Sequence, residues 1–446
     1  MSFQNDLPLL AYIARKIRLD QGLTLENLKD ENISVGTISN IENMEGNPSE
    51  SKVYYLFETL GYDREGLEEL KQRELLELEI LRRKLECVEN MINDEDLTQA
   101  KELLSRYTPR EYNALFPYAN YLKGLHVFFE NNIEKAQKIW IKTLDLCKKQ
   151  VFLSKQHLFS KCYNELSTCF YRQNDIQGAI RYIKKGIDQF QIEEHNEIKY
   201  ALICNNIFYL NKSGQIQEAY ECIKQIWSSI HQIQRMQVKL HLYKSHCSIL
   251  IKNNELEKAE QYCRESIEIT QRNLLPKSLL LDFLNILGSI YLKQRKYKLA
   301  LEYFHLVLDM DEERKSPRRH VDAYTYLTNL YTIYHEWSKA QECMEKALLI
   351  GMEINDDVRL SKILIVSGIS TKKQEKYEKA IPFFKEAVIL CDKHGYSELK
   401  YIAVYELAGC FDKINNRKEF SHWAEEFYFL QRKLGQTLKG DFYEVL

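Results

Sequence analysis

Polar side chains that could bind a peptide backbone recur along this chain about every 40 residues, at matching positions of consecutive expected helices. An asparagine amide carries both a hydrogen-bond donor and an acceptor, so a row of amides can hold an extended main chain without reading its sequence. The strongest candidates are Asn164, Asn285 and Asn329. The full expected set is Asn164, Thr168, Tyr171, Cys204, Phe208, Asn211, Lys244, Ser248, Asn285, Ser289, Thr325 and Asn329, with Asp282 and Asp322 in the same register. The alternative is that these are solvated polar positions on a hollow surface.

A row of cations occupies a second repeated position, near the end of the first helix in five repeats. Its members are Arg172, Lys212, Lys252, Lys293 and Lys373. Such a row could bind acidic side chains or the free carboxylate of a peptide. Cations are also favoured near helix C-termini by the macrodipole, which needs no ligand, and both interpretations stay open.

Near the N-terminus, Ser34 is expected to cap a short helix over residues 35–42 in which Ile38 and Ile41 face inward and the rest face out. Asparagine can pair with adenine, while threonine and valine can contact a thymine methyl group. The positions available to bases and phosphates are Val35, Gly36, Thr37, Ser39, Asn40 and Asn43, with Arg15 and Lys52 as phosphate contacts. Residues 1–73 contain eight Lys or Arg against thirteen Asp or Glu, so a domain kept for dimerisation is the alternative.

Catalytic and metal-binding patterns give no comparable signal. The chain contains no G-x-x-x-x-G-K-[ST], H-E-x-x-H or G-x-S-x-G motif, and its histidines are dispersed. None of its eleven cysteines forms a C-x-x-C pair, and several lie at apolar-periodic positions, which favours buried reduced thiols. We therefore expect no enzyme activity, cofactor or metal.

The elements that position these residues follow from a repeat of about 40 residues. Alanine recurs at residues 136, 179, 219, 259, 300, 340 and 380, mostly with a large side chain four positions later and a small residue twelve positions earlier. This spacing is typical of tetratricopeptide repeats, in which small residues let two helices approach and an aromatic or aliphatic knob follows the alanine. It predicts a superhelical array with a concave binding face.

The expected fold is all-α, with an N-terminal helix-turn-helix domain at 5–73, a connecting helix at 74–93 and a right-handed tetratricopeptide superhelix of about nine helical pairs at 94–446. Leu78, Leu81, Leu85, Val88 and Ile92 form a stripe on the connecting helix that predicts either a self-association seam or packing on the first repeat. The net charge of −2, the lack of an 18-residue apolar stretch and the lack of a secretory signal indicate a cytoplasmic protein without a membrane span.

Residues 21–24 (QGLT), 35–42 (VGTISNIE) and 47–49 (NPS) together closely resemble the phage-repressor-like helix-turn-helix. Combined with the 40-residue array, they make the whole chain resemble the cytoplasmic peptide-pheromone receptors of Gram-positive bacteria, the Rap–Rgg–NprR–PlcR–PrgX family. This resemblance implies a quorum-sensing transcription regulator, a homodimer on a double-stranded DNA operator, whose array binds a short linear signalling peptide. Two alternatives remain: a protein-interaction receptor or scaffold with a vestigial helix-turn-helix, and a modulator of response-regulator phosphorylation.

Overall fold

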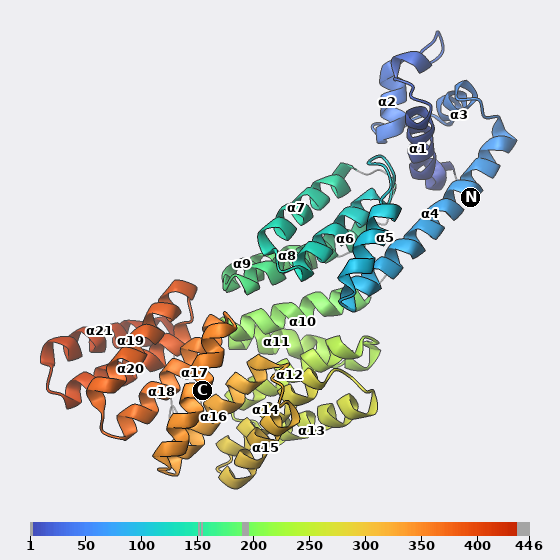
Figure 1. Cartoon of the computed structure of the whole chain (residues 1–446). Coiled ribbons are helices and arrows are strands. Elements are labelled where there is room, and N and C mark those ends of the chain that lie inside the picture. The colour runs from blue at the N-terminus through green and yellow to red at the C-terminus, as the bar shows by residue number, and fades with distance from the viewer. Residues whose placement is uncertain (1–2, 150–151, 153–154, 190–195, 435–446) are drawn as a thin grey trace. The chain divides into compact units, whose positions relative to one another are not determined.

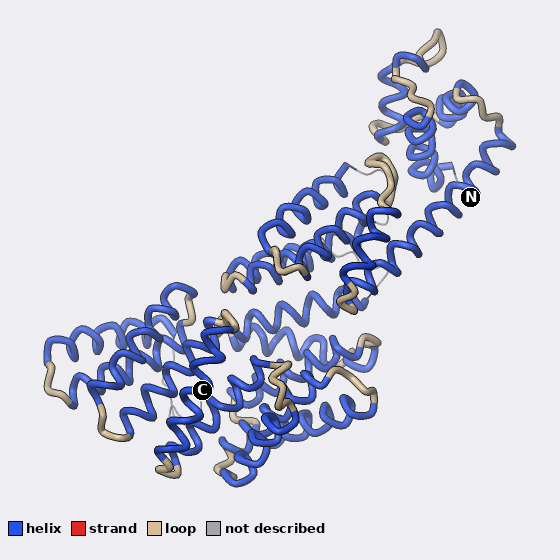
Figure 2. Tube along the Cα trace, in the orientation of Figure 1, coloured by secondary structure: helices blue, strands red, loops and turns tan. Residues whose placement is uncertain are grey.

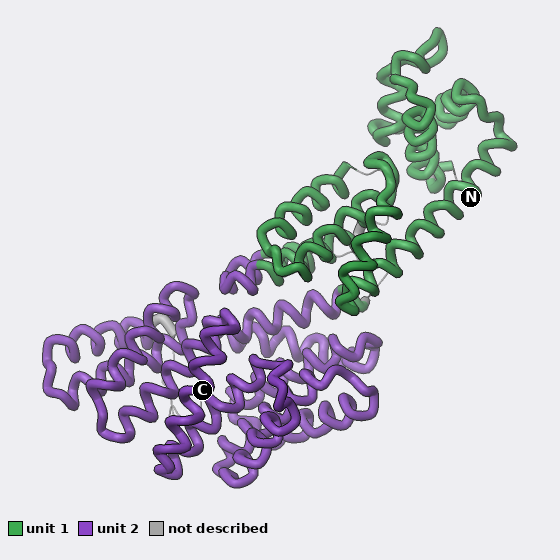
Figure 3. Tube along the Cα trace, viewed as in Figure 1, with its two compact units in different colours: residues 1–169, 182–198 green, residues 170–181, 199–446 purple. Residues whose placement is uncertain are grey.

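The computed structural model describes residues 3–149, 152, 155–189 and 196–434. Every regular element in these ranges is helical, which confirms the expected fold class (Figure 2). The chain divides into two compact units (Figure 3): unit 1 comprises residues 1–169 and 182–198, and unit 2 comprises residues 170–181 and 199–446.

The N-terminal part of unit 1 is a small helical domain. Its helices are α1 (Phe3–Asp20), α2 (Val35–Asn43), α3 (Glu50–Thr59) and the start of α4 (Arg64–Asn93). Leu10, Ile13, Ile38, Ile41 and Phe57 are buried in its shared core, as the apolar spacing predicts. Ser34 caps α2 by accepting a hydrogen bond from the Thr37 N–H at 3.2 Å.

Two local expectations in this domain were wrong. From the sequence, Thr24 is expected to cap a short second helix ending near Lys29. The segment instead forms one 3₁₀ turn (Glu26–Leu28), because the Thr24 and Asn27 side chains bond each other's backbone N–H groups in a competing local turn. In α2, Glu42 does not face out: it is 4 % exposed, and both of its oxygens accept hydrogen bonds from Arg18, at 2.6 and 2.7 Å. An oppositely charged partner makes this buried position tolerable for a carboxylate.

Helix α4 runs without a break through the expected boundary at residue 73. On its C-terminal half Leu85, Val88 and Ile92 are buried in the core of the first repeats, so the packing interpretation of this stripe is the one observed. Leu76 and Ile80, farther along the helix toward its N-terminus, are exposed.

The rest of the chain is a succession of antiparallel helical pairs (Figure 1). After α4 come α5 (Leu97–Tyr107), α6 (Phe116–Phe129), α7 (Ile133–Lys149), α8 (Lys155–Arg172) and α9 (Ile176–Asp188). The following helices are α10 (Asn196–Lys212), α11 (Ile216–Trp227), α12 (Met236–Lys252), α13 (Leu256–Arg272), α14 (Lys277–Lys293) and α15 (Tyr297–Met310). The last are α16 (Pro317–Ile333), α17 (Trp337–Glu353), α18 (Asp357–Lys373), α19 (Tyr377–His394), α20 (Ser397–Lys413) and α21 (Arg417–Leu434). Within the described residues the helices from α4 onward make nine pairs, and this count includes α4, whose C-terminal part was expected to be a connecting helix outside the array.

The repeat pattern packs as the alanine spacing predicts. All seven recurring alanines are fully buried. A Cβ atom added to Gly288 would lie 2.6 Å from the ring of Phe304, and one added to Gly368 would lie 2.6 Å from Phe384. Only glycine lets these aromatic knobs sit against the backbone of the preceding helix.

Unit 2 also contains contacts between repeats far apart in sequence. Lys252 at the end of α12 pairs with Glu398 at the start of α20, at 3.0 Å. The turn after α8 contacts the α18–α19 repeat, because the Asn174 amide donates to Asp357 at 3.2 Å and the Asn174 carbonyl lies 3.1 Å from His394 Nδ1. These contacts join repeats that are not neighbours.

Candidate functional site

A polar hollow of about 280 Å³ lies within unit 2, lined by first helices of successive repeats and by no second helix. Helices α12, α14, α16 and α18 pack against one another in that order, which brings side chains about 40 residues apart in sequence to one surface. The lining residues are Tyr171, Phe208, Asn211, Lys212, Lys244, Ser245, Ser248, Asp282, Asn285, Ile286, Arg318, Arg319, Asp322, Tyr326, Val358, Arg359 and Lys362. They include six cations and two carboxylates, so the hollow carries an excess of positive charge.

Asp282 joins three helices across the wall of this hollow. It accepts hydrogen bonds from Lys244 Nζ at 2.9 Å and from both the Nε and Nη2 atoms of Arg319, at 2.8 and 2.9 Å. Burial would raise the pKa of Asp282, but the charges of Lys244 and Arg319 outweigh it and hold that pKa well below its usual range. Asp282 is therefore ionised at neutral pH, and the two cations are partly neutralised by it.

The same arrangement recurs one repeat later. Arg359 forms a bidentate pair with Asp322, both bonds at 2.9 Å, and its third nitrogen donates to Asp356 at 2.6 Å. Arg318 approaches Asp356 at 3.6 Å. Burial opposes the charge on Arg359, but its carboxylate partners outweigh this and raise the pKa of the guanidinium.

Lys212 differs from the other cations of the hollow. Within the described residues no carboxylate lies within ion-pair distance of its amine, which sits 5.8 Å from the centre of the Phe208 ring. Burial, reinforced by the like charges of Arg359 and Lys362, lowers the pKa of Lys212 from 10.5 to about 7. Burial also lowers the pKa of Lys362. The charged form of both amines is therefore unfavourable in the empty hollow.

Aromatic rings form the apolar part of the lining. Tyr171 packs edge-on against Phe208, with ring centres 5.1 Å apart. Tyr326 stacks on Phe304 beneath the surface at 4.8 Å. Burial raises the pKa of both tyrosines, so both stay neutral hydrogen-bonding groups at any physiological pH.

Half of the residues expected to bind a peptide line this hollow. They are Tyr171, Phe208, Asn211, Lys244, Ser248 and Asn285. Asn164 and Thr168 lie in unit 1, where the Thr168 hydroxyl donates a hydrogen bond to the Asn164 carbonyl at 3.1 Å. Cys204 is buried, and the hydroxyls of Ser289 and Thr325 donate to carbonyls of their own helices. Asn329 is buried and does not line the hollow.

The expected cation row does not converge on one place. Lys212 lines the polar hollow, whereas Lys252 lies in a second, smaller hollow of about 100 Å³ and pairs with Glu398. Lys293, the last residue of α14, donates to the Ile251 carbonyl in the last turn of α12 at 3.2 Å. Arg172 and Lys373 are exposed. The row is therefore a mixture of helix-end and hollow-lining residues.

The sequence interpretation missed Arg319 and Arg359, the two arginines that organise the hollow. Each is the third residue of its helix and pairs with an aspartate 37 residues earlier. The signal was present, because Asp282 and Asp322 are 40 residues apart and so are the two arginines. The two arginines were missed because they lie in the first turn of their helices, outside the positions considered for the groove.

The expected DNA-binding residues occupy the exposed side of the N-terminal domain. Gly36, Asn40 and Asn43 are exposed, and the Asn43 amide donates to Ser39 at 3.2 Å. Val35 and Thr37 are half-buried at the start of α2. On neighbouring helices, Arg15 is half-buried, and Lys52 donates to the Asn32 carbonyl.

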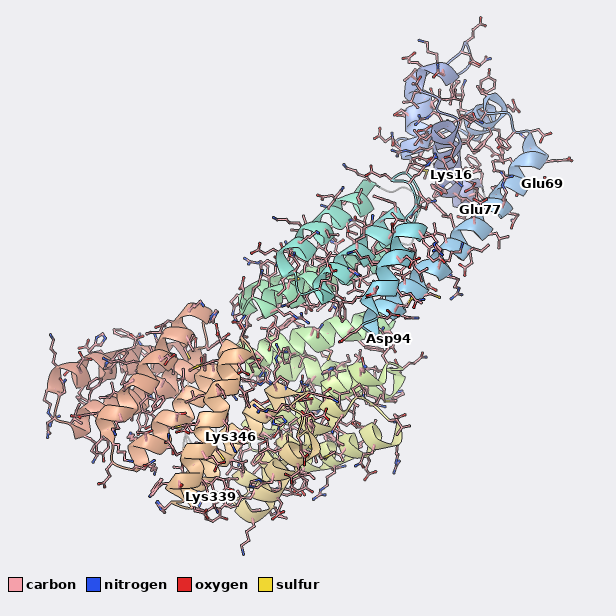
Figure 4. All side chains as sticks on the ribbon, in the orientation of Figure 1. Lys16, Glu69, Glu77, Asp94, Lys339 and Lys346 are labelled. Carbon is pink, nitrogen blue, oxygen red and sulfur yellow. The ribbon has the colours of Figure 1, made fainter. Side chains whose placement is uncertain are left out.

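Half of the eight cations in residues 1–73 are paired with carboxylates of this domain: Lys16, Arg18, Lys29 and Lys71. Lys16 on α1 contacts Glu74 on α4 at 2.6 Å. It also contacts Glu77 on the same helix at 3.3 Å (Figure 4). Lys71 contacts Asp6 at 2.6 Å, and Arg18 contacts the buried Glu42. The pairs of Lys16, Arg18 and Lys71 join residues far apart in sequence and neutralise three of the domain's eight cations.

Comparison with known proteins identifies the fold. The tetratricopeptide repeat family model matches residues 284–318. A Rap protein complexed with Competence and Sporulation Factor superposes with a TM-score of 0.62 at 16% identity, covering 80% of this chain and 99% of that one. The Rap conjugation gene regulator of plasmid pLS20, in complex with the Phr* peptide, has a TM-score of 0.54 at 10% identity, covering 80% and 96%. The apo quorum sensor NprR from B. thuringiensis has a TM-score of 0.52 at 14% identity, covering 73% and 94%.

A curated relative is Hsp70-Hsp90 organizing protein 1 of Arabidopsis thaliana, 29% identical over 110 residues. This match covers 23% of the present chain and 18% of that protein, so it spans less than a fifth of the relative's length. No helix among the described residues is long and apolar enough to cross a membrane. The chain has the tetratricopeptide-repeat fold found in Rap proteins and NprR.

Proposed function

We propose that this protein is a receptor for a short linear peptide, which binds in the polar hollow of unit 2. The observation that carries the proposal is the lining itself, because side chains from consecutive first helices converge on one concave surface and the second helices contribute none. Extended peptides bind to such surfaces in tetratricopeptide arrays. The Rap and pLS20 regulator structures named above, which share the fold, were determined with a bound factor or peptide.

Two asparagine amides in the hollow support peptide binding. Asn211 donates to Ser248 and Asn285 donates to the Arg319 carbonyl, yet the carboxamide oxygen of each is buried without a partner. A buried acceptor without a donor is unfavourable, and rotation of the amide would let it accept a peptide N–H. The free protein therefore holds acceptors that a peptide backbone can satisfy.

The test is calorimetric titration with synthetic peptides on the full chain. Asn285→Ala should weaken binding by about 1–3 kcal/mol, the penalty for leaving a backbone group unpaired. The matched control is Asn273→Ala, an exposed asparagine whose amide donates to its own helix at Ile269. Equal affinity of parent and Asn285→Ala would remove the assigned peptide contact.

For the N-terminal domain we propose operator DNA as the partner, read by the exposed face of α2 in a homodimer that the peptide regulates. Thr37, Ser39 and Asn40 lie on that face, while Ile38 and Ile41 anchor the other, so replacing the three polar residues by alanine should spare the fold. Fluorescence anisotropy with DNA from upstream of the chain's own gene tests this. Loss of sequence-specific binding in the triple variant supports it, and unchanged binding contradicts it.

One observation favours a second candidate, a peptide-responsive receptor that captures a regulatory protein. The cations Lys16, Arg18 and Lys71 are occupied by carboxylates of their own domain, whereas non-specific DNA affinity depends on unpaired cations. Absence of DNA binding at low salt, together with retained peptide binding, would select this candidate. Light scattering with and without DNA tests the homodimer in both cases.

A further inference from the structure

The polar hollow has more positive charge than its own carboxylates can neutralise. Asp282 is shared by Lys244 and Arg319, and Asp322 is taken by Arg359. Arg318 and Lys212 also line the hollow; Arg318 approaches Asp356 at 3.6 Å, but Asp356 already bonds Arg359 at 2.6 Å, and no carboxylate among the described residues lies within ion-pair distance of Lys212. The surplus therefore collects at the end of the hollow formed by α10, α16 and α18.

The cations at this end of the hollow are held in place by the fold. Arg359 cannot leave, because two carboxylates fix its guanidinium and it is only 18 % exposed. Lys212 is held over the Phe208 ring, and Phe208 is wedged against Tyr171 and Tyr209. Like charges kept close together raise the free energy of the empty hollow, and a bound anion would lower it.

We infer that the ligand of this hollow is an acidic peptide, one of whose carboxylates is bound at the end of the hollow where Lys212 and Arg318 line it. The inference rests on the proposed peptide receptor function and names the chemistry of its ligand. The carboxylate comes either from an Asp or Glu side chain or from the peptide C-terminus, since both present the same group. A basic peptide is disfavoured here because it would add to the unbalanced charge.

The experiment uses four pools of synthetic heptapeptides and measures how much of each the full-length protein retains by affinity-selection mass spectrometry. The pools share one randomised uncharged composition and differ at a fixed position, Glu or Gln, and at the C-terminus, free acid or carboxamide. We expect the Glu free-acid pool to be retained roughly tenfold or more above the Gln carboxamide pool, the gain typical of a charge-assisted hydrogen bond. The two mixed pools show which carboxylate is the source.

The variants Lys212→Met and Arg318→Met test where in the hollow the peptide carboxylate binds. Both remove a charge while keeping an apolar stem, and Arg318 is 47 % exposed, so its loss leaves the packing intact. The matched control is Lys346→Met on α17, a second helix whose residues do not line the hollow (Figure 4). We expect the preference for carboxylates to fall in the first two variants and to persist in the control.

The outcomes distinguish a failure of the acidic-ligand inference from a failure of the proposed receptor function. Equal retention of all four pools would overturn the acidic-ligand inference while the receptor function stands. Retention of none would overturn both. A preference that survives in Lys212→Met and Arg318→Met, or that falls equally in Lys346→Met, would show that the anion binds elsewhere.

Discussion

Replacing Lys212 by methionine should stabilise the ligand-free protein at neutral pH. In the folded state burial and like charges lower the pKa of this amine from 10.5 to about 7. At about 1.4 kcal/mol per pKa unit, this shift corresponds to roughly 5 kcal/mol of unfavourable free energy for the charged form. Because the amine is only half-buried, we discount this figure for solvent screening and expect a gain on the order of 1–3 kcal/mol.

The dependence on pH distinguishes this effect from better packing by methionine. The folded pKa lies below the unfolded one, so between about pH 7 and 10.5 the unfolded state binds more protons and the parent becomes more stable as the pH rises. The advantage of Lys212→Met should therefore be largest at or below pH 7 and should disappear toward pH 10.5. Urea unfolding at pH 6.5, 8 and 9.5 measures it, with Lys346→Met as the control. A gain independent of pH, or a loss at pH 7, would refute the reasoning.

Three further predictions follow from the packing and the ion pairs. Gly288→Ala should lower stability by about 1–3 kcal/mol in thermal unfolding, since its Cβ would lie 2.6 Å from the Phe304 ring; an unchanged melting temperature would contradict the close approach. Glu42→Ala should destabilise the N-terminal domain by about 3–5 kcal/mol, because Arg18 would stay buried without its partner; hydrogen exchange of α1 and α2 measures this, and unaltered protection would count against it. Arg359→Met should also cost about 3–5 kcal/mol in denaturant unfolding at pH 7. That loss should shrink at acid pH as Asp356 becomes protonated, which happens below the usual carboxylate range because Arg359 outweighs burial and lowers the pKa of Asp356; a loss that does not shrink in acid would contradict the ion-pair account.

The repeat fold could be predicted because its signal is local and periodic. Small residues such as Gly288 and Gly368 mark where helices must approach, and the aromatic residue sixteen positions later fills that space. These constraints act between neighbouring helices, so sequence spacing maps directly to contact. The same reasoning fixed the cap at Ser34 and the buried face of α2.

The site could be predicted only in part, because its charges are arranged by contacts between different repeats. The register placed Asn211, Lys244 and Asn285 on the hollow correctly, since they share a helix face. It could not show that Arg359 would reach back to Asp322, because that depends on how far successive first helices are offset. The buried Glu42 escaped for the same reason, since its partner Arg18 belongs to another helix.

The contacts between distant repeats in unit 2 change how this part of the molecule should open and close. In an ordinary linear array each repeat touches only its neighbours, so an end can fray while the middle stays folded. Here Asn174, in the turn after α8, contacts Asp357 and His394, and Lys252 contacts Glu398. These contacts link the first repeats of unit 2 directly to its later repeats, so the intervening helices lie inside a closed loop of contacts. Opening any repeat inside this closed loop of contacts strains the others. Hydrogen exchange should therefore show similar amide protection from α10 to α19, as one cooperative unit, rather than protection that falls gradually toward one end. Closing so long a loop has an entropic cost, so these contacts should form late in folding.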